Sequence, residues 1–392
     1  MFMTAGLSAT VSPAVVGVMA DRWVNAEYLY AMCHLFGGLM LLGVPRVKSE
    51  EAIFWILLCY NVFYQPTLAL ATSVSFTSIQ ARGMDVARGF ALARAWGPLG
   101  FFAASWTIPF VEYQHSSAQF YVAAAGSCVL VFFSLALLPR CPPTEVTNGR
   151  ICSQIGLKAF RLFKRLPILI FFIFAAVIGA FLRLPDPFTG VLSFLISPSS
   201  SPSSPSSSSL PQSSTIPLVL ALLSQLSELA GILLAPALLL WMGVKSVMLL
   251  SMMICLCCLN LFLLTQASPL SYTLAASLLS GLCLRAFTMA GALYVDGLVP
   301  NTLRSSAQGI FLMILNGVGG TVGTLPFYLL ATSLDGVFQV WLLFASCAVF
   351  ICVLLLMFVG ETENVHAASI PYRYDPRELL VDGDEDDLDL TS

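Results

Sequence analysis

Long apolar runs separated by short polar connections make up most of the chain. A helix needs about 20 mainly apolar residues to cross a bilayer, and most of the runs have roughly this length. They predict eleven membrane-spanning helices, near residues 3–20, 27–44, 52–74, 89–111, 117–138, 167–195, 215–241, 245–265, 268–295, 306–332 and 338–359. We therefore expect an all-α protein embedded in a lipid bilayer.

The longest charged connection, residues 139–166, lies between the fifth and sixth runs and sets the predicted orientation. Its basic residues are Arg140, Arg150, Lys158, Arg161, Lys164 and Arg165. Short loops rich in Lys and Arg stay in the cytoplasm. Alternation from this loop also places Arg22, Arg82, Arg88, Lys245, Arg304 and the C-terminus inside, and leaves only Arg46 and Lys48 in the outer loops. The pattern predicts a multi-pass membrane protein with a cytoplasmic C-terminus.

The charged loop divides the chain into two helical halves, 1–138 and 167–359, followed by an acidic cytoplasmic tail, 360–392. Within the second half, the Ser/Pro-rich stretch 197–215 has too few apolar residues to pack, and we expect a disordered loop. Five runs precede the central loop and six follow it, whereas transporter halves commonly contain six helices each. The expectation is that one N-terminal helix is missing, which leaves about 11 of 12.

Composition supports the membrane assignment and excludes several functions. The chain is 58% hydrophobic and 10% charged, whereas soluble domains carry about 25% charged residues. Its histidines, His34, His115 and His366, are too far apart in sequence for a ligand-spaced metal or haem site. The sequence shows no extended basic patch that would bind nucleic acid, and no nucleophile with a base that would indicate an enzyme. We expect neither a cofactor nor a metal.

Five ionisable residues fall inside apolar runs: Arg94, Arg183, Asp186, Glu228 and Arg285. A charge at the middle of a membrane costs about 2.5–3.5 kcal/mol on insertion scales, so such groups face a polar cavity or pair with one another. Gln225 and Glu228 are three residues apart and share one helix face. These residues are candidates for a substrate site, and a structural ion pair between helices is the alternative.

Arg94 and Phe101 are seven residues apart and also share a helix face. Forked hydrogen bonds from an arginine, together with an aromatic face, suit a planar ligand. Neutralisation of Arg94 by Glu228 or Asp186 is an equally open interpretation. The polar patch Asn61, Tyr64 and Gln65, in run 52–74, is more typical of contacts between membrane helices.

Several short stretches resemble the major facilitator superfamily and, within it, the bacterial nucleoside:H⁺ symporter family. They occur in the family's order over nearly the whole chain: PAVVGVMADRW (13–23), YAMCH (30–34), QPTLAL (65–70), GMD (83–85), RAWGPLGF (94–101), FFIF (171–174), SQLSE (224–228), GVKSVM (243–248) and RSSAQGIFLMILNGVG (304–319). The resemblance implies a bacterial inner-membrane transporter that takes up a nucleoside with protons by alternating access. It also implies that the family's first helix is absent.

The resemblance places Arg94, Phe101, Gln225 and Glu228 in the family's substrate pocket, with Glu228 as the proton-coupling carboxylate. Other pocket positions depart from the family pattern. Pro98 replaces an expected threonine; Arg183 and Asp186 stand where amides are expected; and Arg285 stands at an aspartate position implicated in binding and coupling. The resemblance further implies that Asp21 and Arg22, in the PxxxGxxADR stretch, latch the inner gate, whereas an ordinary charged turn is the alternative.

The departures change the predicted charge of the pocket. Three arginines now face two carboxylates, and such an excess attracts an anionic solute better than a neutral nucleoside. Two other functions therefore stay open. One is transport of a related anionic solute, and the other is a sensor or scaffold that has lost transport.

Overall fold

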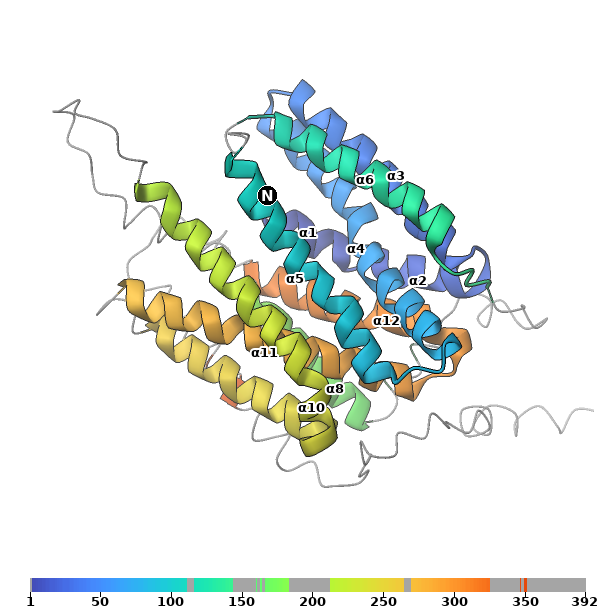
Figure 1. Cartoon of the computed structure of the whole chain (residues 1–392), viewed down its shortest axis with the longest axis vertical. Helices are drawn as coiled ribbons and strands as arrows, with labels where there is room; N and C mark the ends of the chain where they lie inside the picture. Colours follow the sequence, from blue (N-terminus) through green and yellow to red (C-terminus); the bar gives the residue numbers. More distant parts are fainter. Residues whose placement is uncertain are drawn as a thin grey trace, which may run out of the picture.

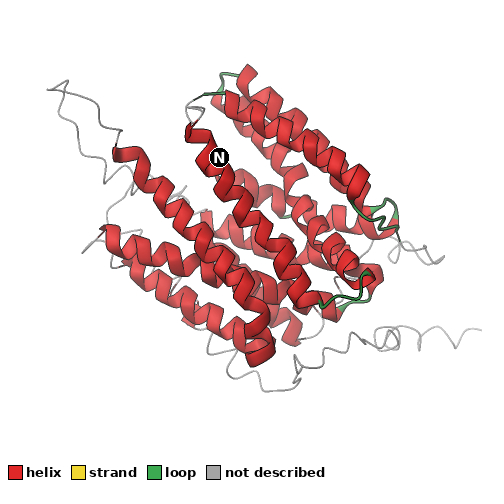
Figure 2. Cartoon of the chain, viewed as in Figure 1, coloured by secondary structure: helices red, strands yellow, loops and turns green. Residues whose placement is uncertain are grey.

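The computed structural model describes residues 2–110, 116–143, 166–182, 212–263 and 269–324, together with residues 160, 163, 346, 349 and 350. All regular elements in these ranges are helices (Figure 2). Six spans there are long and apolar enough to cross a membrane. The expectation of an all-α membrane protein is confirmed.

The first half of the chain folds into helices that match the first five apolar runs. They are α1 (Phe2–Ala9), α2 (Ser12–Arg22), α3 (Ala26–Gly43), the short 3₁₀ turn η1 (Val44–Arg46), α4 (Glu50–Ala81), α5 (Val86–Phe110) and α6 (Ala118–Leu137). Helices α1 and α2 follow one another across a two-residue break and together form the span Met3–Arg22. Helix α3 packs against both α4 and α6 (Figure 1).

Helix α4 is longer than the run 52–74 predicts, because its polar residues satisfy their hydroxyl groups within the helix. Ser75 and Ser78 each donate to the carbonyl four residues earlier at 2.6 Å, and Thr77 donates to the carbonyl of Ser73 at 3.0 Å. Such bonds allow hydroxyl side chains inside a helix. The helix therefore continues to Ala81, beyond the end of the apolar run.

The second half contains α8 (Leu166–Leu182), α10 (Gln212–Leu263), α11 (Pro269–Leu298), the 3₁₀ turn η5 (Asn301–Leu303), α12 (Arg304–Leu312) and the π-helical turn η6 (Met313–Gly319). Helix α10 covers two predicted runs, 215–241 and 245–265. The chain reverses between them at Gly243, whose φ of 76° is readily adopted only by glycine (Figure 1).

The predicted disordered loop 197–215 needs a correction at its end. Residues 212–215 already belong to the first turn of α10, because Ser and Thr are well tolerated where a helix starts. The rest of that loop lies outside the described residues, as do most of the central loop, most of the run 338–359, the acidic tail, Arg183 and Asp186. Predictions about these segments stay predictions.

The two halves meet along α2 and α12, which approach closely through glycine. A Cβ atom at Gly17 would collide with the carbonyl of Ser305, and one at Gly309 with the carbonyl of Pro13. This contact lies near one end of the bundle. At this end Arg22 is the last residue of α2, and Arg82 directly follows α4. We call this end the basic side; the positive-charge pattern predicts that it faces the cytoplasm.

Candidate functional site

A buried ion pair joins α10 and α11 within the second half. Arg285 donates from Nε to Oε2 of Glu228 at 2.7 Å, and its Nη2 lies 2.5 Å from the same oxygen. The Glu228 residue is 6% exposed, whereas the Arg285 side chain is 24% exposed. A buried carboxylate is costly unless it is paired, and Arg285 supplies that pair.

Close packing of the two helices explains why these side chains meet. Gly281, one turn before Arg285, lets α11 approach α10, since a Cβ there would come within 3.0 Å of the Glu228 amide nitrogen. Ser227 also donates its hydroxyl across the contact to the carbonyl of Leu278. Residues four apart share a helix face, so the close contact at position 281 brings Arg285 opposite Glu228.

Arg94 approaches this pair from the first half of the chain. It lies on α5, which packs against α10 (Figure 1), and its charge is within electrostatic range of Arg285 and Glu228. No ion pair of Arg94 is seen with any residue that the structure describes. In this conformation Glu228 forms its ion pair with Arg285 and not with Arg94. Asp186, the other predicted partner of Arg94, lies outside the described residues.

Two further predicted pocket residues lie on α10 and α5. Gln225 is partly exposed and precedes Glu228 by about one turn of α10. Phe101 is half exposed on α5, two turns beyond Arg94. The other two predicted pocket residues, Arg183 and Asp186, are outside the described part of the chain. The described set therefore contains two arginines and one carboxylate.

Two tyrosines near this cluster could not be placed there from the sequence. Tyr30 on α3 and Tyr64 on α4 both interact electrostatically with Arg94. In the sequence, Tyr64 was notable only as part of the polar patch with Asn61 and Gln65. Asn61 of that patch links two helices, since its side chain donates to the Thr4 hydroxyl at 3.2 Å. Tyr30 gave no signal, because a lone tyrosine in an apolar run fits packing equally well.

Asp21, a predicted gate residue, contacts the other half of the protein directly. Its carboxylate accepts hydrogen bonds from the backbone N–H of Ser305 at 3.0 Å and of Ser306 at 2.7 Å. The Ser306 hydroxyl donates to it at 2.6 Å. These are unpaired N–H groups at the start of α12, so Asp21 caps a helix of the opposite half. Arg22 is partly exposed beside it.

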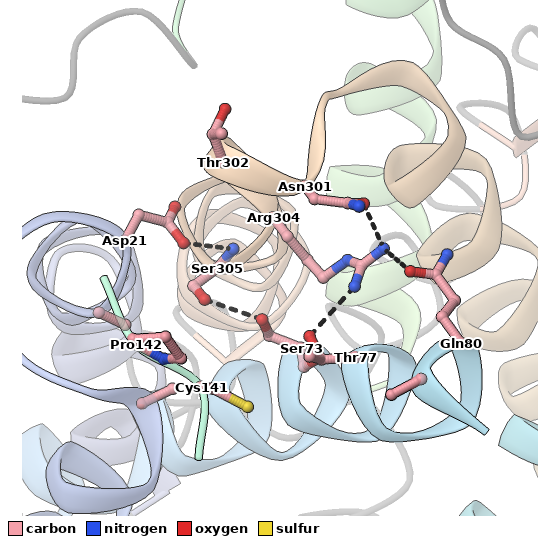
Figure 3. A pocket seen from close by; sticks show the side chains of 13 residues that line it. Asp21, Ser73, Thr77, Gln80, Cys141, Pro142, Asn301, Thr302, Arg304 and Ser305 are labelled. Carbon is pink, nitrogen blue, oxygen red and sulfur yellow. Dashed lines mark hydrogen bonds between the residues drawn. The ribbon is translucent and has the colours of Figure 1, made fainter. Parts of the chain in front are cut away.

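Arg304, which sequence reasoning treated only as a charge that sets topology, is a second link at the same end. Its guanidinium pairs with Asp296 of α11 at 2.6 Å. It also donates to Thr77 and Gln80 of α4 at 3.1 and 2.6 Å, and to Asn301 at 2.8 Å (Figure 3). A hydrogen bond between the hydroxyls of Ser73 and Ser305, at 2.8 Å, lies next to it. The two halves are thus joined on the basic side by buried polar contacts.

Comparison with known proteins agrees with this arrangement. The model of the nucleoside H⁺ symporter family matches residues 1–364. The chain belongs to this family. It is 31% identical to xanthosine permease of Escherichia coli over 95% of the chain and 89% of that protein. It is 33% identical to nucleoside permease NupG of Escherichia coli, over 82% of the chain and 76% of that protein.

Solved structures give the fold. A point mutant of nucleoside transporter NupG superposes with a TM-score of 0.69 at 30% identity, over 91% of this chain and 89% of that one. The human organic anion transporter MFSD10 superposes with a TM-score of 0.65 at 14% identity, over 91% of this chain and 82% of that one. At this identity the likeness supports the fold alone. The protein is a membrane transporter with the major facilitator fold, as the resemblance implied. It is not an enzyme.

Proposed function

We propose that the protein carries a nucleoside across the bacterial inner membrane together with a proton, by alternating access. The observation that carries the proposal is the cluster of Arg94, Glu228 and Arg285, in which α5 of one half packs against α10 of the other and α10 packs against α11. Relatives named as nucleoside and xanthosine permeases support the substrate class.

Each residue of the cluster has a chemical role in this proposal. Arg94 donates forked hydrogen bonds to the nucleobase or ribose, Phe101 stacks on the base and Gln225 adds an amide. Glu228 carries the proton. When Glu228 is protonated, its attraction to Arg285 falls, and Arg285 can turn toward the substrate. Proton and substrate binding are then linked through one ion pair.

The basic side supplies the gate in this mechanism. Asp21 and Arg304 join the halves there, so transport requires these bonds to break whenever the central cluster becomes accessible from the basic side. Because the bonds form between the halves and not within one half, they stabilise a single state of the alternating cycle.

The proton role is tested by replacing Glu228 with Gln in reconstituted vesicles. We expect pH-driven accumulation of uridine to be lost, whereas exchange of uridine at equal pH continues. Glu50→Gln is the matched control, because Glu50 is exposed at the start of α4, and it should accumulate uridine normally. Unchanged accumulation in Glu228→Gln would show that another group carries the proton. A wild-type protein that binds uridine without any flux would instead favour the sensor function.

One observation favours a second substrate class, a related anionic solute. Arg285 takes up the charge of Glu228, which leaves Arg94 as an uncompensated cation among the described residues of the cluster. Competition between uridine and the acidic nucleoside orotidine separates the two classes. A clear preference for uridine would rule out the anionic solute, and a preference for orotidine would support it.

A further inference from the structure

A cavity lies on the basic side, away from the central cluster. Its volume is about 350 Å³. One wall comes from α2 and α4 of the first half, a second from Cys141 and Pro142 after α6, and a third from residues 301–305 of the second half (Figure 3). The cavity therefore has its full shape only while the halves are closed on this side.

The wall formed after α6 is fixed by a buried glutamate. Glu27 of α3 is 2% exposed and accepts hydrogen bonds from the backbone N–H of Cys141 at 2.9 Å and from Asn25 at 2.8 Å. The carbonyl of Cys141 accepts a bond from the N–H of Ala26 at 3.2 Å. These contacts hold Cys141 in place beside the cavity, so the pocket is more than a gap between loops.

The charges that line the cavity are already compensated. Asp21 is bound by the start of α12, and Arg304 is paired with Asp296. A charged ligand would therefore find no opposite charge free to pair with it in this lining. Since complementary electrostatics decide which ligands fit, the cavity suits a neutral molecule.

Two side-chain amides give the cavity its hydrogen-bonding character. Gln80 and Asn301 each give their oxygen to Arg304, which leaves their NH₂ groups to donate. In the described part of the chain, no acceptor is seen for either NH₂ group. Such donors recognise carbonyl oxygens and ring nitrogens, which line the edges of nucleobases. The volume is at the lower end of the range for small-molecule pockets, about 300–1,000 Å³.

We propose that this cavity is a second site for a nucleoside, which binds from the basic side while the halves are closed there and delays their reopening. The nucleoside class rests on the proposed function. A ligand that contacts both halves stabilises the state in which they touch. At about nine times its dissociation constant, it would raise the ratio of closed to open molecules roughly tenfold. Nucleoside that accumulates on the basic side would thus slow its own further uptake.

Alkylation of Cys141 tests the site directly. Purified protein is treated with N-ethylmaleimide with or without uridine, and the modification of each cysteine is measured by mass spectrometry. The decisive sample is Arg94→Ala, which removes the arginine from the central cluster and leaves the cavity intact. We expect uridine to slow alkylation of Cys141 at least threefold in wild type and in Arg94→Ala, while the exposed Cys257 is unaffected. Loss of protection in Arg94→Ala, or its absence in both, overturns the proposal.

A transport assay provides a second test that does not need Arg94→Ala to fold. Ala81 lines the cavity at the end of α4 and is exposed, so Ala81→Phe should fill the space, with Ala81→Ser as the matched control. Uridine loaded on the basic side of vesicles should slow uptake at least threefold in wild type and Ala81→Ser, and much less in Ala81→Phe. Equal inhibition in all three, or none in wild type, overturns the second site. Absence of any uridine uptake or binding would overturn the proposed function instead.

Discussion

Asp21 offers the sharpest test of how the halves are held together. The aspartate is 7% exposed, and its carboxylate accepts the N–H groups of Ser305 and Ser306 and the Ser306 hydroxyl. In Asp21→Ala these two buried N–H groups lose their acceptor as long as the halves remain closed. When the halves separate, water can bind the same groups. The substitution therefore destabilises the closed state of the basic side selectively.

The magnitude follows from the bonds that are lost. A buried donor left without a partner costs about 1–3 kcal/mol, and two such donors are left here. The favourable effect of a carboxylate at a helix N-terminus, about 0.3–1 kcal/mol, is lost as well. Allowing for partial entry of water, we expect a loss of about 3 kcal/mol. This corresponds to roughly a 100-fold shift toward the open state, at about 1.4 kcal/mol for each factor of ten.

Alkylation of Cys141 also measures this shift, because that thiol lines the cavity between the halves. Cys141 should be alkylated much faster in Asp21→Ala than in wild type. Its alkylation rate in Asp21→Asn, which keeps one acceptor oxygen, should lie between the two. Asp85→Ala is the control. Asp85 caps α5 within the first half, accepting the N–H of Arg88 at 2.7 Å, and its loss should leave the labelling rate unchanged. A folded Asp21→Ala that labels at the wild-type rate would refute the reasoning.

Three further predictions concern other contacts. Arg285→Ala leaves Glu228 buried without its partner, which should destabilise the protein by about 3–5 kcal/mol in thermal unfolding. Gly17→Ala forces α2 away from α12 and should speed alkylation of Cys141, whereas Gly126→Ala, where a Cβ meets nothing within 4 Å, should not. Burial, with a contribution from a nearby glutamate, raises the pKa of the Cys141 thiol. The rise of its alkylation rate with pH should therefore occur at a higher pH than for a free cysteine.

Each of these predictions has a clear contrary result. Arg285→Ala combined with Glu228→Gln should recover part of the lost stability, and no recovery would show that the pair is not the cause. Equal labelling in the two glycine variants would mean that the contact between α2 and α12 does not limit opening. For Cys141, the raised pKa means that the thiol holds its proton more tightly than a free cysteine does, so the reactive thiolate forms only at higher pH. A pH profile identical to that of a free cysteine would contradict this sign.

The sequence by itself determined the membrane class and the approximate helix positions, and it singled out candidate pocket residues such as Arg94 and Glu228. These are local properties: hydrophobic length predicts a span, and a charge inside a span predicts a polar neighbourhood. The family motifs around Arg94 and Glu228 then indicated a transporter, which the family match and the NupG structure confirm. Where the sequence predicted helix boundaries poorly, as in α4, hydroxyl groups bonded within the helix were the reason.

The tertiary structure decided which charges pair. From the sequence, Glu228 could neutralise Arg94 or line a pocket with it, and Arg285 was expected to line the same pocket as a further cation. Close contact at Gly281 brings Arg285 within 2.5 Å of Glu228, and these two residues are 57 positions apart in sequence. The closed basic side likewise depends on Asp21 meeting a helix start 284 residues away. Pairings over such separations follow from how helices pack, which a periodic pattern in one chain segment does not specify.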